Sequence, residues 1–249
     1  MTDRPILFSA PMIRALLDGR KTQTRRVLKP EPFIDAMGNF CAMDRKGKLW
    51  NYGQRLDGTP CLDHYTEKCV RFAKGDRLWI KENWLPDPPR DHDAWDDWEC
   101  SPVEFDGCGL KAAMVPPALR HADHALYAAT WTGTELRWKP SIHMPRWASR
   151  LTLTATDVRV QRLQECSATD AIAEGIAVGT PLPQVPDSKG DIYHDGVTDP
   201  IDGWTRDPVA AYASLWDTIN GAGAWHANPW VVALTFTVER RNIDAGASA

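Results

Sequence analysis

Residues 150–175 read RLTLTATDVRVQRLQECSATDAIAEG, and this stretch combines a strand signal with a helix signal. Apolar and polar residues alternate from Leu151 onward, as in a half-buried strand. Ser167 and Asp170 have the spacing of a capping box, which opens a short helix that Gly175 ends. A strand followed by a short helix predicts an α+β architecture.

Two segments on the C-terminal side extend this pattern. Asp207 and Pro208 occupy the N-cap and first-turn positions of a predicted helix that ends at Asn220-Gly221. Residues 230–238 read WVVALTFTV and predict a buried strand. The α+β character therefore continues almost to the end of the sequence.

The N-terminal half also alternates between strand and helix signals. Residues 6–9 predict a short strand, and Ser9 is the expected N-cap of a helix that ends at Gly19. Residues 77–84 and 125–131 predict two more strands. We therefore expect one compact α+β domain over residues 1–241 with a mixed or antiparallel, barrel-like sheet.

The patterned segments form the predicted core, and polar segments rich in turn residues separate them. The core comprises residues 1–30, 74–85, 125–176 and 206–241. Three loop-rich insertions are expected at 31–73, 86–124 and 177–205, with a tail at 242–249.

Composition excludes several classes of protein. The chain has 249 residues, of which 43% are hydrophobic and 25% are charged, as in a globular protein. No apolar run approaches the roughly 18 residues of a membrane span, so we expect no membrane partner. The N-terminus lacks the pattern of a secretory signal, which predicts a cytoplasmic location. The six cysteines are spread along the chain and are expected to be reduced thiols.

The net charge of −4 hides an uneven distribution. Residues 1–30 contain seven Lys and Arg against two Asp, whereas residues 85–108 contain eight acids against one Arg. Basic core segments that pack together would form a positive surface suited to a phosphate-bearing ligand. The alternative is that these charges scatter over a solvated face.

The segment from Gly19 to Arg26, GRKTQTRR, places hydroxyl groups among cations. Lys21, Arg25 and Arg26 are candidates for binding a phosphate, and Thr22 and Thr24 are candidates for a hydrogen bond to it or to a base. A lysine beside other cations has a lowered pKa, which suits a base or nucleophile. The alternative is a solvated basic turn.

Glu174 is expected in the last turn of its short helix, just before Gly175. A carboxylate there faces the negative end of the helix dipole, at a cost of about 0.3–1 kcal/mol. Such an unfavourable placement can mark a functional acid. The alternative is an exposed glutamate that accepts the penalty.

Two other segments carry candidate site residues. Glu82 ends the predicted strand at 77–84 and is expected either to pair with Lys21 or to form a surface ion pair. Residues 138–147, WKPSIHMPRW, mix aromatic residues with cations, which suits stacking on a base while binding its phosphate. Their candidate contacts are Ser141, His143 and Arg146. The alternative is a rigid loop with its tryptophans in the core.

No cofactor is expected, because the sequence has no Gly-rich phosphate loop, no His-Glu-x-x-His pattern and no nucleophile elbow. A structural zinc ion is a minor alternative. Cys61 and His64 with Cys69, and Cys41 upstream, supply four ligand types, but at irregular spacing. We therefore predict no metal site.

Four blocks, at residues 6–27, 75–84, 140–176 and 215–236, together resemble the ASCH-domain family, and in particular its long members encoded by phages and prophages. The resemblance implies a PUA-like fold, which is a small mixed β-barrel flanked by short helices. It also implies RNA or a modified nucleoside as partner. For a phage- or prophage-encoded chain, the cytoplasm would be that of the bacterial host.

One small bacterial branch of that family hydrolyses N4-acetylcytidine with a Lys and a Thr from a G-[RK]-K-T-x-T segment and a Glu on a later helix. Residues 19–24 match that segment, so the resemblance implies Lys21, Thr24 and Glu174 as catalytic residues. The match at Glu174 is looser, and the three insertions have no counterpart in that branch.

Three functions follow from these observations. The first is an amidohydrolase that removes an acyl group from a modified pyrimidine such as N4-acetylcytidine, with Lys21 as base, Glu174 as acid, and Thr24 or water as nucleophile. Arg25, Arg26 and Arg146 would bind a phosphate or ribose. The second is an RNA or modified-base binding module without turnover. The third is a phage assembly protein. The sequence leaves the oligomeric state and the role of the insertions open.

Overall fold

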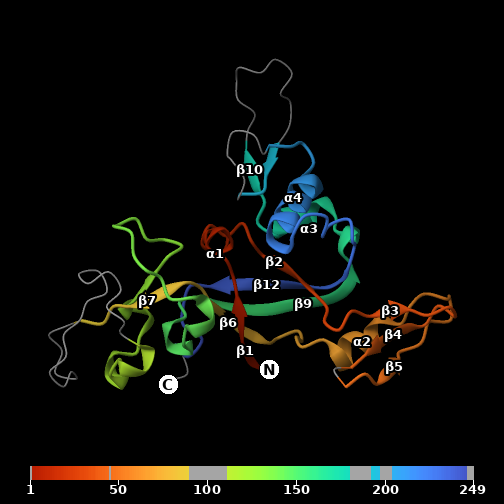
Figure 1. Ribbon diagram of the computed structural model, residues 1–249, viewed down its shortest axis with the longest axis horizontal. Helices are drawn as coiled ribbons and strands as arrows, with labels where there is room; N and C mark the ends of the chain where they lie inside the picture. Colours follow the sequence, from red (N-terminus) through yellow and green to blue (C-terminus); the bar gives the residue numbers. More distant parts are fainter. Residues whose placement is uncertain (1, 45, 90–110, 180–191, 197–203, 246–249) are drawn as a thin grey trace, which may run out of the picture. The chain divides into compact units, whose positions relative to one another are not determined.

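The structure, a computed structural model, describes residues 2–44, 46–89, 111–179, 192–196 and 204–245 (Figure 1). The described part is α+β, with strands that outnumber its few short helices. The single domain over residues 1–241 stays a prediction, and the chain contacts divide the chain into two compact units. Unit 1 comprises Met1–Gly19, Gly75–Thr154 and Thr237–Ala249, and unit 2 comprises Arg20–Lys74 and Ala155–Phe236.

Unit 1 is built on a parallel pair of strands. Strand β1 (Asp3–Leu7) runs parallel to β6 (Arg77–Lys81), and β6 pairs antiparallel with the first residues of β9 (Thr152–Arg162). Helix α1 (Ala10–Leu17) follows β1, as predicted. It ends before Gly19, whose φ of 74° favours glycine.

The rest of unit 1 packs around Trp84, which is fully buried. Strands β7 (Trp84–Pro86) and β8 (Ala125–Tyr127) pair antiparallel. Trp84 contacts Trp147 edge to face, with ring centroids 5.6 Å apart. Five short 3₁₀ helices complete the described part: η1 (Ala112–Met114), η2 (Pro117–Leu119), η3 (Ala122–His124), η4 (Ser141–His143) and η5 (Arg146–Ala148).

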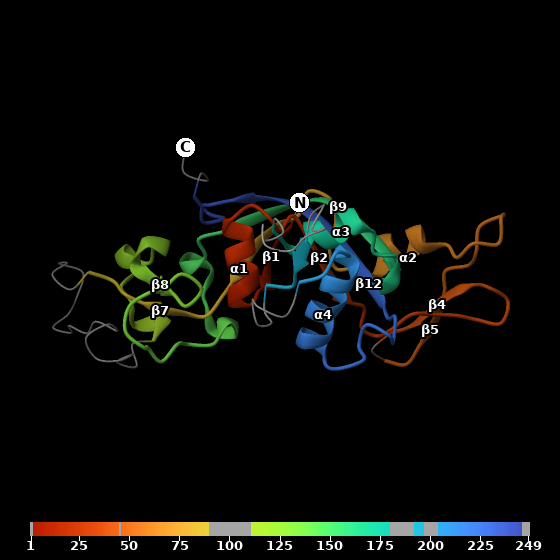
Figure 2. The same cartoon turned by 90° about the horizontal axis from the view of Figure 1, so that it is seen from above.

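Unit 2 contains the predicted capped helices. Ser167 and Asp170 form the capping box of α3 (Ala168–Ala173), and Asp207 accepts from the backbone of Val209 at the start of α4 (Pro208–Asn220). Helices α3 and α4 lie side by side (Figures 1 and 2). Strand β2 (Gln23–Val27) pairs antiparallel with β12 (Trp230–Glu239).

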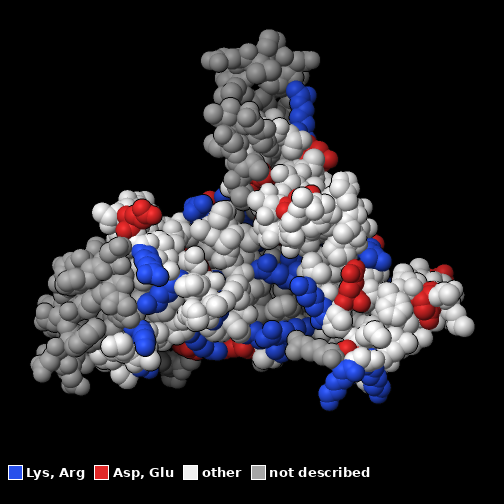
Figure 3. All heavy atoms as spheres, in the orientation of Figure 1, with Lys and Arg blue, Asp and Glu red and all other residues white. Residues whose placement is uncertain are grey.

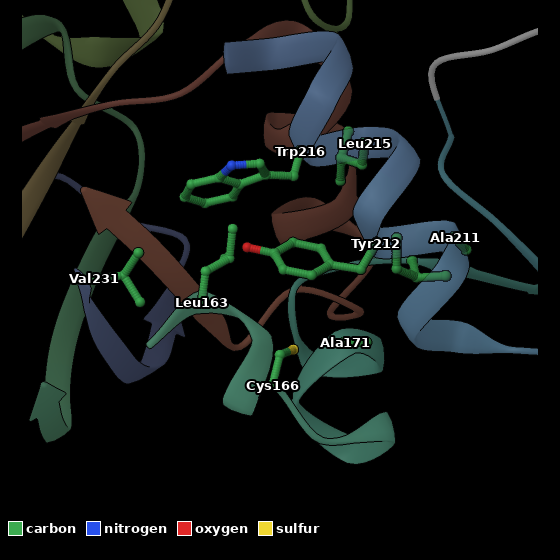
Figure 4. Close-up of a cluster of buried hydrophobic side chains, with 9 residues drawn as sticks. Leu163, Cys166, Ala171, Ala211, Tyr212, Leu215, Trp216 and Val231 are labelled. Atoms are coloured by element: carbon green, nitrogen blue, oxygen red, sulfur yellow. The ribbon is translucent and has the colours of Figure 1, made fainter. Parts of the chain in front are cut away.

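An apolar cluster joins these elements of unit 2 (Figure 4). Tyr212 and Trp216 project from α4 toward Leu163 of η6 (Leu163–Glu165). Val231 of β12 and Ala171 of α3 belong to the same cluster. Each such side chain, when fully buried, stabilises the fold by roughly 1.5–3 kcal/mol. The cluster therefore holds α3 and α4 against the sheet.

The predicted insertions are more ordered than expected. Residues 31–73 were expected to be loop-rich, but they form β3 (Phe33–Ile34), β4 (Phe40–Met43), β5 (Leu49–Asn51) and α2 (Leu62–Cys69), and the strands pair antiparallel in that order. Phe40 contacts both Tyr65 and Trp230, so this segment has its own apolar contacts with the rest of unit 2. The sequence conceals it because its strands are only two to four residues long.

The other two insertions are only partly described. Residues 90–110 of the second and 180–191 and 197–203 of the third lie outside the described residues. Within the third, β10 (Ala177–Gly179) pairs antiparallel with β11 (Ile192–His194). The described residues contain no helix long and apolar enough to cross a membrane.

The main sheet has the strand order β1-β6-β9-β12-β2, in which β1 and β6 run parallel and the pairs β6–β9 and β12–β2 run antiparallel. Strands β9 and β12 each continue from one unit into the other. The prediction of a tail from residue 242 is wrong for its first residues. Ile243 is buried, and the Asn242 amide donates to three carbonyl groups of unit 1.

Candidate functional site

The predicted basic segment forms one wall of a buried polar cluster in unit 2. Side chains alternate between the two faces of an extended chain, so Lys21, Gln23 and Arg25 share one face. All three contact acidic residues of the segment containing α3. This face of the extended segment therefore places the predicted lysine, Lys21, in contact with the predicted glutamate, Glu174.

Lys21 and Glu174, 153 residues apart in sequence, form a buried ion pair. The Lys21 Nζ atom lies 2.8 Å from Glu174 Oε2 and 2.7 Å from the Glu174 main-chain oxygen. The exposed fractions of the two residues are 0% and 3%. Their main chains also form an antiparallel bridge.

The end of α3 explains why a glutamate is tolerated at this position. Glu174 is the C-cap residue, where helix carbonyl groups lack intrahelical partners and carry partial negative charge. The Lys21 ammonium bonds one of these carbonyl groups, and Arg20 Nη1 donates to the oxygen of Gly175 at 2.6 Å. These two cations offset both the helix dipole and the carboxylate.

Arg25 is the second cation of the cluster, with a fully buried side chain. Its Nη1 atom donates to Glu174 Oε1 at 3.1 Å and to Gln23 Oε1 at 2.5 Å, and its Nη2 atom lies 3.0 Å from Asp170 Oδ2. Two cations thus face two carboxylates. Such near-neutral pairing is what allows charges to be buried.

The surroundings shift the pKa of several groups in the cluster. Burial lowers the pKa of Lys21, and Arg26 and Arg25 lower it further, whereas Glu174 opposes the shift. This is the predicted direction, but burial rather than neighbouring cations is its main cause. Burial and the nearby Glu174 raise the pKa of Tyr212 well above its usual value, so its hydroxyl stays protonated.

The predicted hydroxyl residues lie on the other face of the strand. Thr24 is buried, and alternation along β2 directs its side chain away from the face that carries Gln23 and Arg25. Thr22 is exposed, and its main chain bonds Ala173 and Phe236. The structure therefore brings Lys21 and Glu174 together, without Thr24.

Glu82 lies in unit 1, where it forms an ion pair, as one of the two predictions for its side chain expected. It does not pair with Lys21, and it is buried rather than at the surface. Its two carboxylate oxygens accept from Arg150 Nε and Nη2, each at 2.9 Å. The Arg150 guanidinium also lies 4.0 Å from the centre of the Tyr127 ring. Burial raises the pKa of Glu82 although Arg150 opposes the shift.

The remaining predicted contacts also lie in unit 1. Arg146 is held by ion pairs with Asp3 and Asp244, so its charge is already compensated. His143 is exposed, and Ser141 is partly buried beside Asn83.

The positive surface expected from the core segments is weaker than the sequence suggests. Lys21 and Arg25 are buried against acids, and Arg146 pairs with two Asp residues. Figure 3 shows Lys and Arg side chains in several groups on the drawn face, with Asp and Glu among them. Arg26, another predicted phosphate contact, follows Arg25 directly in sequence and is partly buried in unit 2.

Nothing in the described residues forms a cluster of three or more potential metal ligands. Cys41, Cys61, Cys69 and Cys166 are free thiols, and Cys69 lies 2.7 Å from the Tyr52 hydroxyl. Cys100 and Cys108 lie outside the described residues.

Sequence reasoning missed three members of the buried cluster: Gln23, Asp170 and Tyr212. Asp170 was assigned only to the helix cap, because the capping pattern shows no second partner, and Gln23 and Tyr212 were not singled out. The cluster can exchange a proton between Lys21 and Glu174 with little change in net charge. No protein-family model, no curated protein and no solved structure matches the chain significantly.

Proposed function

We propose that the chain is an ASCH-type amidohydrolase that removes an acyl group from N4 of a modified cytidine, with Lys21 and Glu174 as its proton-transfer pair. The mixed five-stranded sheet is compatible with a PUA-like barrel, and we assign the protein to the cytoplasm of a bacterial host. The observation that carries the proposal is the 2.8 Å contact between the Lys21 ammonium and the Glu174 carboxylate.

Amide hydrolysis needs a base to activate the nucleophile and an acid to protonate the leaving amine. The lowered pKa of Lys21 makes its neutral amine more accessible than that of an ordinary lysine. In the proposed reaction, the Lys21 ammonium first passes its proton to the Glu174 carboxylate. The neutral Lys21 amine then takes a proton from water, the water oxygen attacks the acyl carbonyl, and Glu174 passes its proton to N4, which restores the starting ion pair. The C–N bond then breaks, giving the free acid and cytidine.

Water is a better nucleophile here than Thr24. Thr24 is 1% exposed, and its side chain points away from the face of β2 that carries the ion pair. A direct proton transfer from its hydroxyl to Lys21 would require the strand to turn over. We therefore assign Thr24 to packing against the sheet.

The same burial imposes a requirement on the reaction. Because Lys21 and Glu174 are almost fully buried, the substrate can reach them only after the chain opens locally. Such opening steps limit the turnover of many enzymes. We expect turnover to be slow compared with that of an enzyme whose base lines an open pocket.

This burial also favours a second candidate function, which is recognition of RNA or a modified base without turnover. In that case the ion pair would hold α3 against β2 and would never meet the ligand. The two functions differ in one result, because only the first predicts product release.

The test is the release of cytidine from N4-acetylcytidine, followed by chromatography, for the native chain and for Lys21→Met. Loss of a general base typically costs about 10²–10⁴ in rate, so we expect turnover to fall by at least 100-fold. Lys74→Met is the matched control, because Lys74 is an exposed lysine of the same unit.

The fold of each variant is checked by circular dichroism, since removing one partner of a buried pair can destabilise a protein by about 3–5 kcal/mol. Glu174→Gln keeps the shape of the side chain and provides a second test if Lys21→Met unfolds. No cytidine from the native chain would rule out this substrate. Equal rates in native and Glu174→Gln chains would rule out the proposed pair.

A further inference from the structure

Unit 1 contains a cavity of about 370 Å³ that is separate from the residues proposed for catalysis. Its apolar walls include Leu7, Phe8 and Ala128, and its polar walls include Glu82, Asn83 and Ser141. The volume falls within the roughly 300–1,000 Å³ of small-molecule sites, near the lower end. A mainly apolar cavity with a few polar groups is typical of a site for one small organic ligand.

The polar wall offers hydrogen-bond acceptors held in place. Arg150 bonds each carboxylate oxygen of Glu82 once, and a carboxylate has about four lone-pair sites. Asn83 is also fixed, because its Oδ1 atom accepts from the backbone of Ser141 at 3.0 Å and its main-chain oxygen accepts from Ala128. The Asn83 side-chain NH₂ group is an additional donor at the same wall.

The charges around the cavity restrict the ligand. Among the described residues that line it, there is no Lys, Arg or His. A phosphate or carboxylate ligand would therefore meet the carboxylate of Glu82 without a lining cation. Because Arg150 forms an ion pair with Glu82, the wall also lacks the free negative charge that an ammonium ligand requires. An uncharged ligand that brings N–H donors fits both conditions.

We propose that this cavity binds the uncharged base of a nucleoside that bears an exocyclic amino group, with Glu82 as acceptor and Phe8 and Leu7 as apolar walls. The choice of a nucleobase among amino-bearing heterocycles rests on the proposed function. The cavity itself and the choice of Glu82 as acceptor do not depend on the proposed function. Carboxylates accept from the amino group of cytosine in other recognition sites.

The recognition residue in this proposal is Glu82, and its specificity follows from its chemistry. Uridine has a carbonyl oxygen where cytidine has an amino group, so it would place an acceptor against the acceptor. A buried polar group left without its partner costs about 1–3 kcal/mol. We therefore expect cytidine to bind at least about fivefold more tightly than uridine, since 1.4 kcal/mol corresponds to a factor of ten.

The test is a calorimetric titration of the full chain with cytidine and with uridine. Ala128→Leu adds side-chain atoms to the wall of the cavity, and it should weaken cytidine binding at least tenfold. Ala118→Leu adds the same atoms at an exposed alanine of the same unit and should leave binding unchanged. Ser141→Leu narrows the cavity from another wall and replaces Ala128→Leu if that variant does not fold.

The same titration on Lys21→Met separates this inference from the proposed function. Cytidine binding that survives Lys21→Met but not Ala128→Leu supports the cavity, even if the native chain never hydrolyses N4-acetylcytidine. Binding that survives Ala128→Leu but not Lys21→Met would overturn the cavity while leaving the proposed catalytic pair in place. Equal affinity for uridine, or no binding of either nucleoside, would also overturn it.

Discussion

The contact between Lys21 and Glu174 offsets an electrostatic cost at each of the two residues. Glu174 stands at the helix end that repels a carboxylate, and Lys21 is a cation in a site that excludes water. Their contact, together with Arg25, reduces both costs. The sequence indicated an unfavourable glutamate and a perturbed lysine, but it gave no means to derive their contact across 153 residues.

The nucleophile can be tested at Thr24. Thr24→Val removes the hydroxyl and keeps the shape of the side chain, so it should fold normally. If water attacks the acyl group, we expect kcat to stay within about tenfold of the native value. A loss of the about 10²–10⁴ typical of a catalytic group, in a chain with unchanged circular dichroism, would make Thr24 the nucleophile and contradict this assignment.

Asp170 makes a testable contribution to stability at low pH. Although burial raises it, hydrogen bonds from Gln23 and the charge of Arg25 dominate and lower the pKa of Asp170 to about 2, from 3.8. A carboxyl group whose pKa is lower in the folded state stabilises the fold fully above the unfolded pKa and loses that contribution as pH falls. The window is therefore between about pH 4 and pH 2.

The measurement is the urea-unfolding free energy of the native chain and of Asp170→Asn at pH 7 and pH 2.5. We expect the advantage of the native chain to shrink on acidification by up to about 2 kcal/mol, because one pKa unit corresponds to about 1.36 kcal/mol. An advantage that stays constant between the two pH values would show that the charge of Asp170 is not stabilised in the fold.

Among the elements, those with local signals could be predicted from the sequence. The caps at Ser167 and Asp207 are formed as expected, and β12 covers its predicted segment. These features depend on residues a few positions apart. Strands β3 and β4 could not be predicted, because such short strands are defined by pairing and by contacts such as that of Phe40 with Trp230.

Helix α4 provides the prediction at this scale. Asp207 Oδ1 accepts from the Val209 backbone at 2.9 Å, which satisfies one of the free N–H groups of the first turn. Asp207→Ala should lower the unfolding free energy by about 1 kcal/mol. Asp207→Ser keeps a capping oxygen and should lose only a small part of it. Equal losses for the two variants in urea titrations would show that the cap is not the cause.

For the whole molecule, the division into two units and the partner of Glu82 escaped prediction. Glu82 and Arg150 are 68 residues apart and belong to segments that the sequence presents as unrelated. The candidate site is also divided. Lys21, Thr24 and Glu174 lie in unit 2, whereas Glu82, Ser141 and Arg146 lie in unit 1. The resemblance implied only Lys21, Thr24 and Glu174, whereas the chemistry of the residues suggested the other three, and each unit supplies a different polar environment.

Thiol accessibility tests how tightly unit 2 is packed around β4, which contains Cys41, and around Cys166, which follows η6. Burial raises the pKa of Cys166 to about 12 and also raises the pKa of Cys41, whereas Cys69 is exposed. Because the thiolate is the reactive form, iodoacetamide should modify Cys69 in the native chain well before Cys41 or Cys166. Mass spectrometry of the peptides gives the order, and urea supplies the unfolded reference. Labelling of Cys166 as fast as Cys69 without urea would contradict the packing of α3.

The most direct test of the central claim is an NMR titration of the lysine side-chain amines, because catalysis requires Lys21 to be buried against Glu174 with a lowered pKa. Burial lowers the pKa of both Lys21 and Lys81, so we expect two lysine signals to titrate below the usual 10.5, and only the Lys21 signal to be absent from Lys21→Arg. Titration of every lysine at the usual value, with Lys21→Arg removing only an ordinary signal, would contradict the buried pair and the function proposed from it.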